Sequence, residues 1–90
     1  MKTFLITYTL DSFDELYPII SEKIQSYPKW ARISQYAWLI QTEEKAPDIR
    51  NDLKTSIVDR GSIFVIDVSS SAWATFAVSR NVTNWMKENI

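Results

Sequence analysis

The sequence of 90 residues contains no cysteine and no histidine. Without cysteine it has no disulfide framework, no thiolate zinc site and no cysteine nucleophile. Without histidine it lacks the commonest general base and the commonest metal ligand of proteins. Enzyme classes that depend on these two side chains are therefore excluded.

Neither sign of charge dominates, and long apolar runs are missing. Ten Lys and Arg stand against 11 Asp and Glu, for a net charge of -1, whereas proteins that coat nucleic acid usually present one strongly basic face. This balance still allows a local basic patch. No apolar stretch approaches the roughly 20 residues of a membrane span, and no signal peptide precedes the first strand pattern. We therefore expect a cytoplasmic protein with no membrane partner.

Glycine and proline are also scarce, at one and three residues, so we expect one domain over residues 1–90 built mostly from regular structure. Four Trp, four Tyr and four Phe argue against disorder. Runs of β-branched and aromatic residues predict strands over residues 3–9, 29–34, 35–41 and 62–68. Apolar residues at helical spacing predict helices over residues 13–27 and 42–58, and a short amphipathic helix from residue 79. Residues 72–78 fit either a short edge strand or a turn.

This order predicts an α+β fold, a ferredoxin-like β-α-β-β-α-β sandwich with both helices on one face of the sheet. The core covers residues 3–68, and a tail that ends in a helix covers residues 69–90. The last strand is apolar on both faces, with Ile63 and Val65 on one and Phe64, Ile66 and Val68 on the other. Such strands are usually covered on both sides. Either the tail or a second copy must then cover the second face, and we favour a homodimer packed sheet to sheet.

Several motifs resemble one protein family. They are a first strand ending in TYTLDS, a hairpin RISQYAWLI, a helix opening with Thr-Glu-Glu, and a fourth strand FVIDV. Over about residues 3–70 the chain resembles the small, non-integrase subunit of the CRISPR spacer-acquisition complex and its stand-alone relatives. The resemblance implies a ferredoxin-like homodimer that serves antiviral defence. It also implies that the dimer holds duplex DNA between integrase subunits, or that it is a metal-dependent nuclease as described for some members.

The acidic residue after the first strand has two interpretations. In the family a carboxylate closes this strand, but the matching position here is Thr9, and Asp11 lies two residues further on. A hydroxyl is a weaker ligand for Mg²⁺ than a carboxylate. One interpretation places Asp11 of each subunit on Mg²⁺ at a dimer seam, as in an endoribonuclease or endodeoxyribonuclease. The sequence favours the other, a helix cap, because Ser12 and Glu15 have the spacing of a capping box.

Basic residues are spread along the chain. Those that could form a phosphate-binding stripe are Lys29, Arg32, Arg50, Lys54, Arg60 and Arg80. Dimerisation would double such a stripe. Asp48 and Asp52 alternate with the basic residues of the second helix, which also fits an ordinary solvated surface. A further alternative is a base-stacking platform of Tyr8, Tyr36 and Trp38, although aromatic residues on central strands more often form the core.

These observations predict a small dimeric scaffold that binds duplex DNA or RNA, without strong catalysis and without a cofactor. Two alternatives stay open: a protein-interaction module that regulates or blocks another protein, and an Mg²⁺-dependent endonuclease. The near-neutral charge, the replaced carboxylate and the apolar second face favour the module. Asp67 lies at the other end of the sheet from Asp11, and we expect it to be exposed or paired with Lys2.

Overall fold

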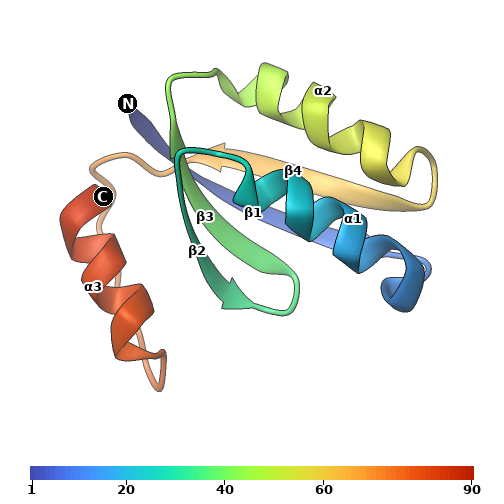
Figure 1. Ribbon diagram of the computed structural model, residues 1–90. Helices are drawn as coiled ribbons and strands as arrows, with labels where there is room; N and C mark the ends of the chain where they lie inside the picture. Colours follow the sequence, from blue (N-terminus) through green and yellow to red (C-terminus); the bar gives the residue numbers. More distant parts are fainter.

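The computed structural model describes all 90 residues and forms a mixed α+β domain with one antiparallel sheet of four strands and three helices. In chain order the elements are β1 (Lys2–Leu10), α1 (Phe13–Gln25), β2 (Lys29–Ser34), β3 (Ala37–Thr42), α2 (Ala46–Ile57), β4 (Gly61–Asp67) and α3 (Arg80–Asn89). The strands lie in the order β2-β3-β1-β4 (Figure 1). The predicted succession of strands and helices is therefore confirmed. No helix is long and apolar enough to cross a bilayer.

The main core lies between the sheet and the pair α1 and α2, which share one face of it (Figure 1). The alternation of β1 produces this arrangement, because Phe4, Ile6 and Tyr8 all point to that face and are buried. In the helices, apolar residues three or four positions apart lie on one side and are buried against the sheet. They are Leu16, Ile20 and Ile24 in α1 and Ile49, Leu53 and Ile57 in α2. The inward side chains of the strand and of the two helices therefore form one core layer between the sheet and the helices.

Two predicted boundaries shift because pairing in the sheet overrides local preference. The second helix begins at Ala46 and not at residue 42, because Thr42 is still paired with Lys2 across β3 and β1. The strand β3 begins at Ala37 and not at residue 35, because the hairpin turn and an irregularity in β2 take up the residues between them. The first helix ends at Gln25, before Pro28.

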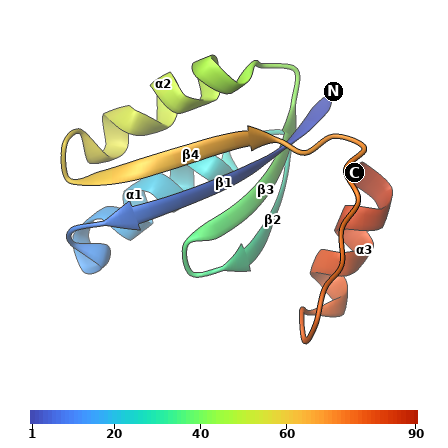
Figure 2. The ribbon, with the colours of Figure 1, turned by 180° about the vertical axis from the view of Figure 1, so that it is seen from behind.

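The second face of the sheet is covered over only half its width. Val82 and Met86 of α3 are buried against Leu39 of β3, so the predicted inward side of this helix is confirmed. Figure 2 shows α3 beside β2 and β3, whereas β1 and β4 are seen with no helix in front of them. On this open half Phe64 is 64% exposed and Ile66 is 48% exposed. The tail therefore covers part of the face and leaves the outward side of β4 bare.

Polar contacts attach the end of α3 to the sheet. Thr3, which is 1% exposed, donates its hydroxyl hydrogen to the carbonyl of Asn89. The side chain of Gln41 donates to the same carbonyl at 3.4 Å. The backbone N–H of Thr3 donates to Ser69 Oγ at 2.8 Å. The helix is thereby held at its carboxyl end, next to the start of β1.

Residues 68–79 run beside α3 in both views (Figures 1 and 2). Residues 72–78, which fit a strand or a turn by sequence, belong to no helix or strand. Within them Phe76 is 94% exposed, and Ala77 has a φ of 59°. A left-handed residue interrupts an extended backbone, which explains why this apolar segment does not continue as a strand.

Candidate functional site

Asp11 directly follows the end of β1. Its backbone N–H donates to the carbonyl of Arg60 at 2.9 Å, but its exposed carboxylate accepts no hydrogen bond. Ser12 is the N-cap residue of α1, yet its side chain makes no capping bond. Glu15 instead accepts from the Arg60 guanidinium at 2.7 Å. The predicted capping box, and the capping role of Asp11, are therefore wrong, because a charged donor draws Glu15 away from the helix terminus.

No group of three or more Asp, Glu, His or Cys residues is arranged to hold a metal ion. Asp67 lies at the far end of the sheet from Asp11, since it pairs with Phe4 while Leu10 pairs with Gly61. Its carboxylate lies 3.5 Å from the Lys2 ammonium, as predicted. The backbone N–H of Ser69, and to a lesser degree Lys2, lower the pKa of the Asp67 carboxyl below its ordinary value.

The aromatic residues proposed as a stacking platform are mostly core residues. Tyr8 is 4% exposed and Trp38 is 1% exposed. The Trp38 indole N–H donates to the Tyr8 hydroxyl at 2.9 Å, and burial raises the pKa of Tyr8 to about 12. Only Tyr36, at the hairpin turn, presents its ring to solvent. The platform is therefore wrong, because the central strands turn these side chains toward the helices.

The predicted basic residues lie on separate parts of the surface. Lys29 and Arg32 lie on the edge strand β2. Arg50 and Lys54 lie on α2, which packs on β4 at the opposite edge of the sheet. Arg60 precedes β4 and is paired with Glu15. One chain thus presents two separate basic regions, and the predicted role of these residues in binding phosphates stays a prediction.

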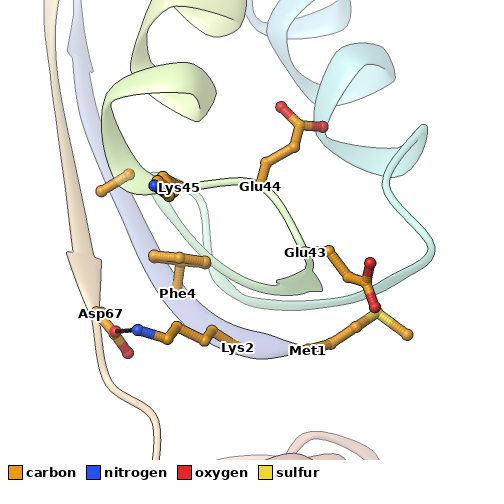
Figure 3. A pocket seen from close by; sticks show the side chains of 8 residues that line it. Met1, Lys2, Phe4, Glu43, Glu44, Lys45 and Asp67 are labelled. Atoms are coloured by element: carbon orange, nitrogen blue, oxygen red, sulfur yellow. Dashed lines mark ion pairs between the residues drawn. The ribbon is translucent and has the colours of Figure 1, made fainter.

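A shallow cavity of about 490 Å³ lies where β1 begins and α2 begins (Figure 3). It is lined by Met1, Lys2, Phe4, Glu43, Glu44, Lys45, Ala46 and Asp67. Figure 3 shows the Lys2 ammonium directed at Asp67. Both signs of charge line this cavity, and it contains no nucleophile beside a base. Its chemistry fits a solvated rim better than a catalytic site.

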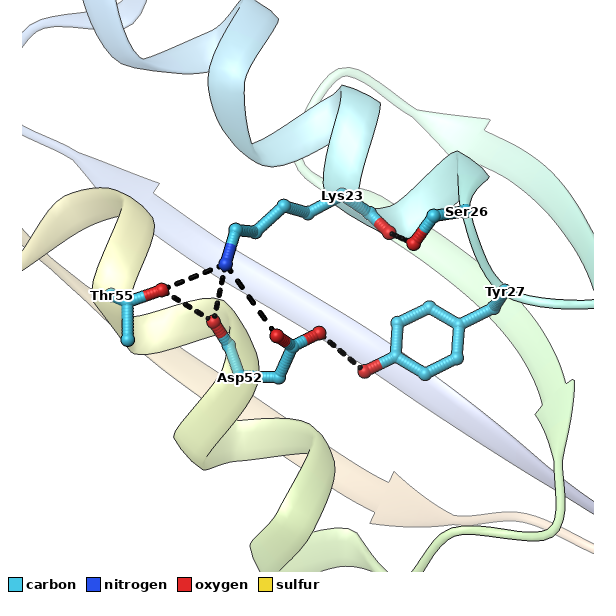
Figure 4. Close-up of polar contacts among 5 residues, drawn as sticks. All are labelled: Lys23, Ser26, Tyr27, Asp52 and Thr55. Atoms are coloured by element: carbon cyan, nitrogen blue, oxygen red, sulfur yellow. Dashed lines mark hydrogen bonds and ion pairs between the residues drawn. The ribbon is translucent and has the colours of Figure 1, made fainter.

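A polar network joins α1 to α2 (Figure 4). The Tyr27 hydroxyl donates to Asp52 Oδ2 at 3.0 Å, and the Lys23 ammonium donates to Thr55 Oγ1 at 2.8 Å. Burial, followed by the hydrogen bond and the negative charge of Asp52, raises the pKa of Tyr27 well above its ordinary value. All four groups are engaged with one another, so the network fixes the helices and offers no free group for catalysis.

The sequence predicted the apolar second face of β4 that carries Phe64 and Ile66, and both side chains are exposed. It did not predict that the tail covers only the half of this face at β2 and β3. A cavity between β2 and α3, lined by residues of both elements, was also missed, because no local pattern shows on which side of the sheet α3 packs. Comparisons of the chain with protein-family models, with curated proteins and with solved structures found no match.

Proposed function

We propose that this chain is a non-catalytic scaffold of the ferredoxin-like class that forms a homodimer and binds nucleic acid through its phosphates. The observation that carries the proposal is the open half of the sheet, with Phe64 and Ile66 exposed side by side on β4. Exposed apolar patches of this kind mark interaction sites. The element order and the strand order β2-β3-β1-β4 support the ferredoxin-like assignment.

The partner that fits this patch best is a second copy. Its partners across β1 are uncharged, since Phe64 pairs with Thr7 and Ile66 pairs with Leu5. Two such surfaces can meet through a twofold axis without burying an unpaired charge. The resemblance to the CRISPR-adaptation subunit, and with it a role in antiviral defence inside the cell, belongs to the same proposal.

Phosphate binding is supported by basic groups that are not neutralised. Lys29, Arg32, Arg50 and Lys54 form no ion pair, whereas Lys2, Lys23 and Arg60 each pair with a carboxylate. Dimerisation would bring two sets of free basic groups into one particle. Such binding must weaken steeply as salt is added, because counterions are released from the nucleic acid.

The dimer is tested by sedimentation at micromolar concentration. The chain has a mass of 10.5 kDa, and the wild type should sediment as twice that mass. Phe64→Lys should give a monomer, because a charge would be buried in the interface. Val58→Lys is the matched control, since Val58 is 73% exposed in the turn before β4 and lies outside the patch.

A protein-interaction module is the second candidate, and a specific observation favours it. Phe76 is 94% exposed on the segment beside α3, which adds an apolar contact point away from β4. If the wild type sediments as a monomer and duplex DNA is not bound at low salt, the module replaces the scaffold. No observation favours the endonuclease, because no group of three or more Asp, Glu, His or Cys residues in the chain is arranged to hold a metal ion.

A further inference from the structure

The edge strand β2 presents aromatic and basic side chains on the side of the sheet that carries α1. Side chains alternate along a strand, and Ile33 points to the other side, where α3 packs. Trp30 and Arg32 point to the α1 side, since Trp30 packs on Trp38 of the main core. The Arg32 guanidinium likewise lies over the Tyr17 ring of α1. Both side chains therefore lie on one surface at the outer edge of the sheet.

Trp30 supplies an aromatic ring that is held in place. Its centroid lies 5.6 Å from that of Trp38 at an interplanar angle of 61°. Trp38 is 1% exposed, and its indole N–H donates to the Tyr8 hydroxyl. Trp30 itself is 41% exposed. Part of its indole thus rests on the core while the rest is open, and a surface ordered in advance loses little entropy when a ligand binds.

Arg32 lies two residues further along β2, about 6.6 Å from Trp30, and its charge is unpaired. Its guanidinium carbon lies 5.3 Å from the centre of the Tyr17 ring, a cation–π contact that orients the side chain. Its Nε donates to the carbonyl of Ser34 at 3.3 Å. No carboxylate forms an ion pair with it. The terminal N–H groups of the guanidinium are therefore free to bind a phosphate.

Tyr36, in the turn between β2 and β3, adds a second aromatic ring on the same side. It meets the Tyr8 ring edge-on at 6.0 Å and the ring of Phe13, the first residue of α1, edge-on at 5.4 Å. Its side chain is 40% exposed. Along the direction of β2, Arg32 lies between the rings of Trp30 and Tyr36. We call these three residues the edge stripe.

The hairpin that carries the edge stripe contains no negative charge. No Asp or Glu occurs from Lys23 to Thr42, so an anion that approaches this edge meets no repulsion from β2 or β3. An apolar protein partner would bury Arg32 without a countercharge, which is unfavourable. A polyanion that also carries flat rings satisfies the guanidinium and the aromatic rings together.

We propose that the edge stripe binds an unpaired segment of a nucleic-acid strand. One base stacks on Trp30, a second stacks on Tyr36, and Arg32 contacts the phosphate between them. A duplex is disfavoured, because its bases are stacked on one another and do not offer their faces to the protein. The inference rests on the proposed nucleic-acid binding, and it adds the site and the state of the strand.

The test measures the fluorescence anisotropy of three labelled probes at low salt: a 12-nucleotide single strand of mixed sequence, the matching duplex, and an abasic strand of equal charge. The single strand should bind at least about fivefold more tightly than the abasic strand, which is the lower end of what stacking of one base contributes to affinity. It should also bind more tightly than the duplex. Equal affinity for the single strand and the abasic strand would overturn the inference.

Variants of the aromatic residues locate the site. Trp30→Leu should weaken binding of the single strand by at least about fivefold and leave binding of the abasic strand unchanged. Trp73→Leu is the matched control, because Trp73 is 37% exposed and lies in the segment beside α3, outside the edge stripe. Its affinities should stay within twofold of wild type. Loss of the preference for the intact strand in Trp73→Leu, with Trp30→Leu unaffected, would overturn the assignment.

Arg32→Gln tests the phosphate contact at an exposed position and does not disturb the core. It should weaken the intact and the abasic strand alike by at least about tenfold, because a hydrogen bond to a charged group is lost. Lys29→Gln removes the same charge from β2 but on the other side of the sheet, where Lys29 donates to Asn89 Oδ1 at 3.4 Å. It should weaken both strands less. Equal effects of the two variants would overturn the role of Arg32. Circular dichroism verifies the fold of each protein.

The outcomes separate this inference from the proposed function. If the three probes bind equally and neither Trp30→Leu nor Arg32→Gln changes the affinity, the edge stripe is not the site, while the scaffold proposal survives. If no nucleic acid binds at all, both are overturned.

Discussion

Thr3 and Asn89, which stand at opposite ends of the chain, are joined by a hydrogen bond from the Thr3 hydroxyl to the Asn89 carbonyl. The two residues are 86 positions apart in sequence. The bond lies at the point where α3 meets β1, and Gln41 contributes a second donor to the same carbonyl. The position of α3 on the sheet, and with it the cavity between β2 and α3, therefore depends on this contact.

Thr3→Val should loosen α3. The substitution keeps the shape of the side chain but removes the donor, which should lower the free energy of unfolding by about 1–3 kcal/mol. Amide hydrogen exchange in residues 82–90 should accelerate more than exchange in β1 or β3. Thr9→Val is the control, because Thr9 is exposed on the same strand. Unchanged exchange in α3 would contradict the anchoring role.

Tyr27 should make the protein less stable at alkaline pH. The folded protein holds the phenolic proton to a higher pH than the unfolded chain does, because burial and Asp52 raise the pKa of Tyr27. The unfolded tyrosine titrates near 10. Above about pH 10 the unfolded chain therefore loses a proton that the folded protein keeps, and stability falls as pH rises. Tyr8, with its pKa raised to about 12, acts in the same direction.

Urea unfolding of wild type and Tyr27→Phe between pH 7 and 11 tests this linkage. The variant should be less stable than wild type at pH 7 by about 1–3 kcal/mol, because Asp52 loses a donor. Its stability should then fall less steeply above about pH 10. Tyr36→Phe, whose hydroxyl is exposed and unbonded, should follow the wild-type curve. Parallel curves for Tyr27→Phe and wild type would refute the raised pKa.

Gly61→Ala should destabilise the pairing of β1 with β4. A Cβ atom at Gly61 would collide with the backbone carbonyl oxygen of Thr9, which cannot move without disturbing the sheet. Overpacking of this kind costs about 1–3 kcal/mol. Thermal unfolding of Gly61→Ala should therefore show a clearly lowered midpoint, while Ser62→Ala, next to it on the strand, should stay near wild type. A midpoint equal to wild type would mean that the carbonyl can yield.

Asp11→Ala should have little effect. The Asp11 carboxylate makes no hydrogen bond, so the change in stability should stay within about 0.5 kcal/mol, less than the loss of a helix cap. Cleavage assays with RNA and DNA, with Mg²⁺, Mn²⁺ or chelator, should give the same result for the variant and the wild type. Chelator-sensitive cleavage that vanishes in a folded Asp11→Ala protein would establish the endonuclease in place of the scaffold.

Much of the fold follows from short-range patterns. The alternation in β1 predicted its buried face, and helical spacing predicted the inward residues Leu16, Ile20 and Ile24 of α1 and Val82 and Met86 of α3. The scarcity of Gly and Pro predicted that most of the chain lies in helices and strands. These inferences succeed because periodicity of side-chain direction is a property of neighbouring residues along the backbone.

The candidate sites depended on contacts between distant residues. Glu15 has the spacing of a capping residue, yet its partner is Arg60, which is 45 positions away. Trp30 and Trp85 line one cavity only because α3 packs beside β2, and Phe64 stays bare only because α3 leaves β4 uncovered. The sequence by itself determined which residues are apolar and how they repeat. The tertiary structure alone decided which of them meet. The side of the sheet on which a helix packs is set by contacts between distant residues, such as that of Thr3 with Asn89. No local pattern in the sequence encodes such a contact.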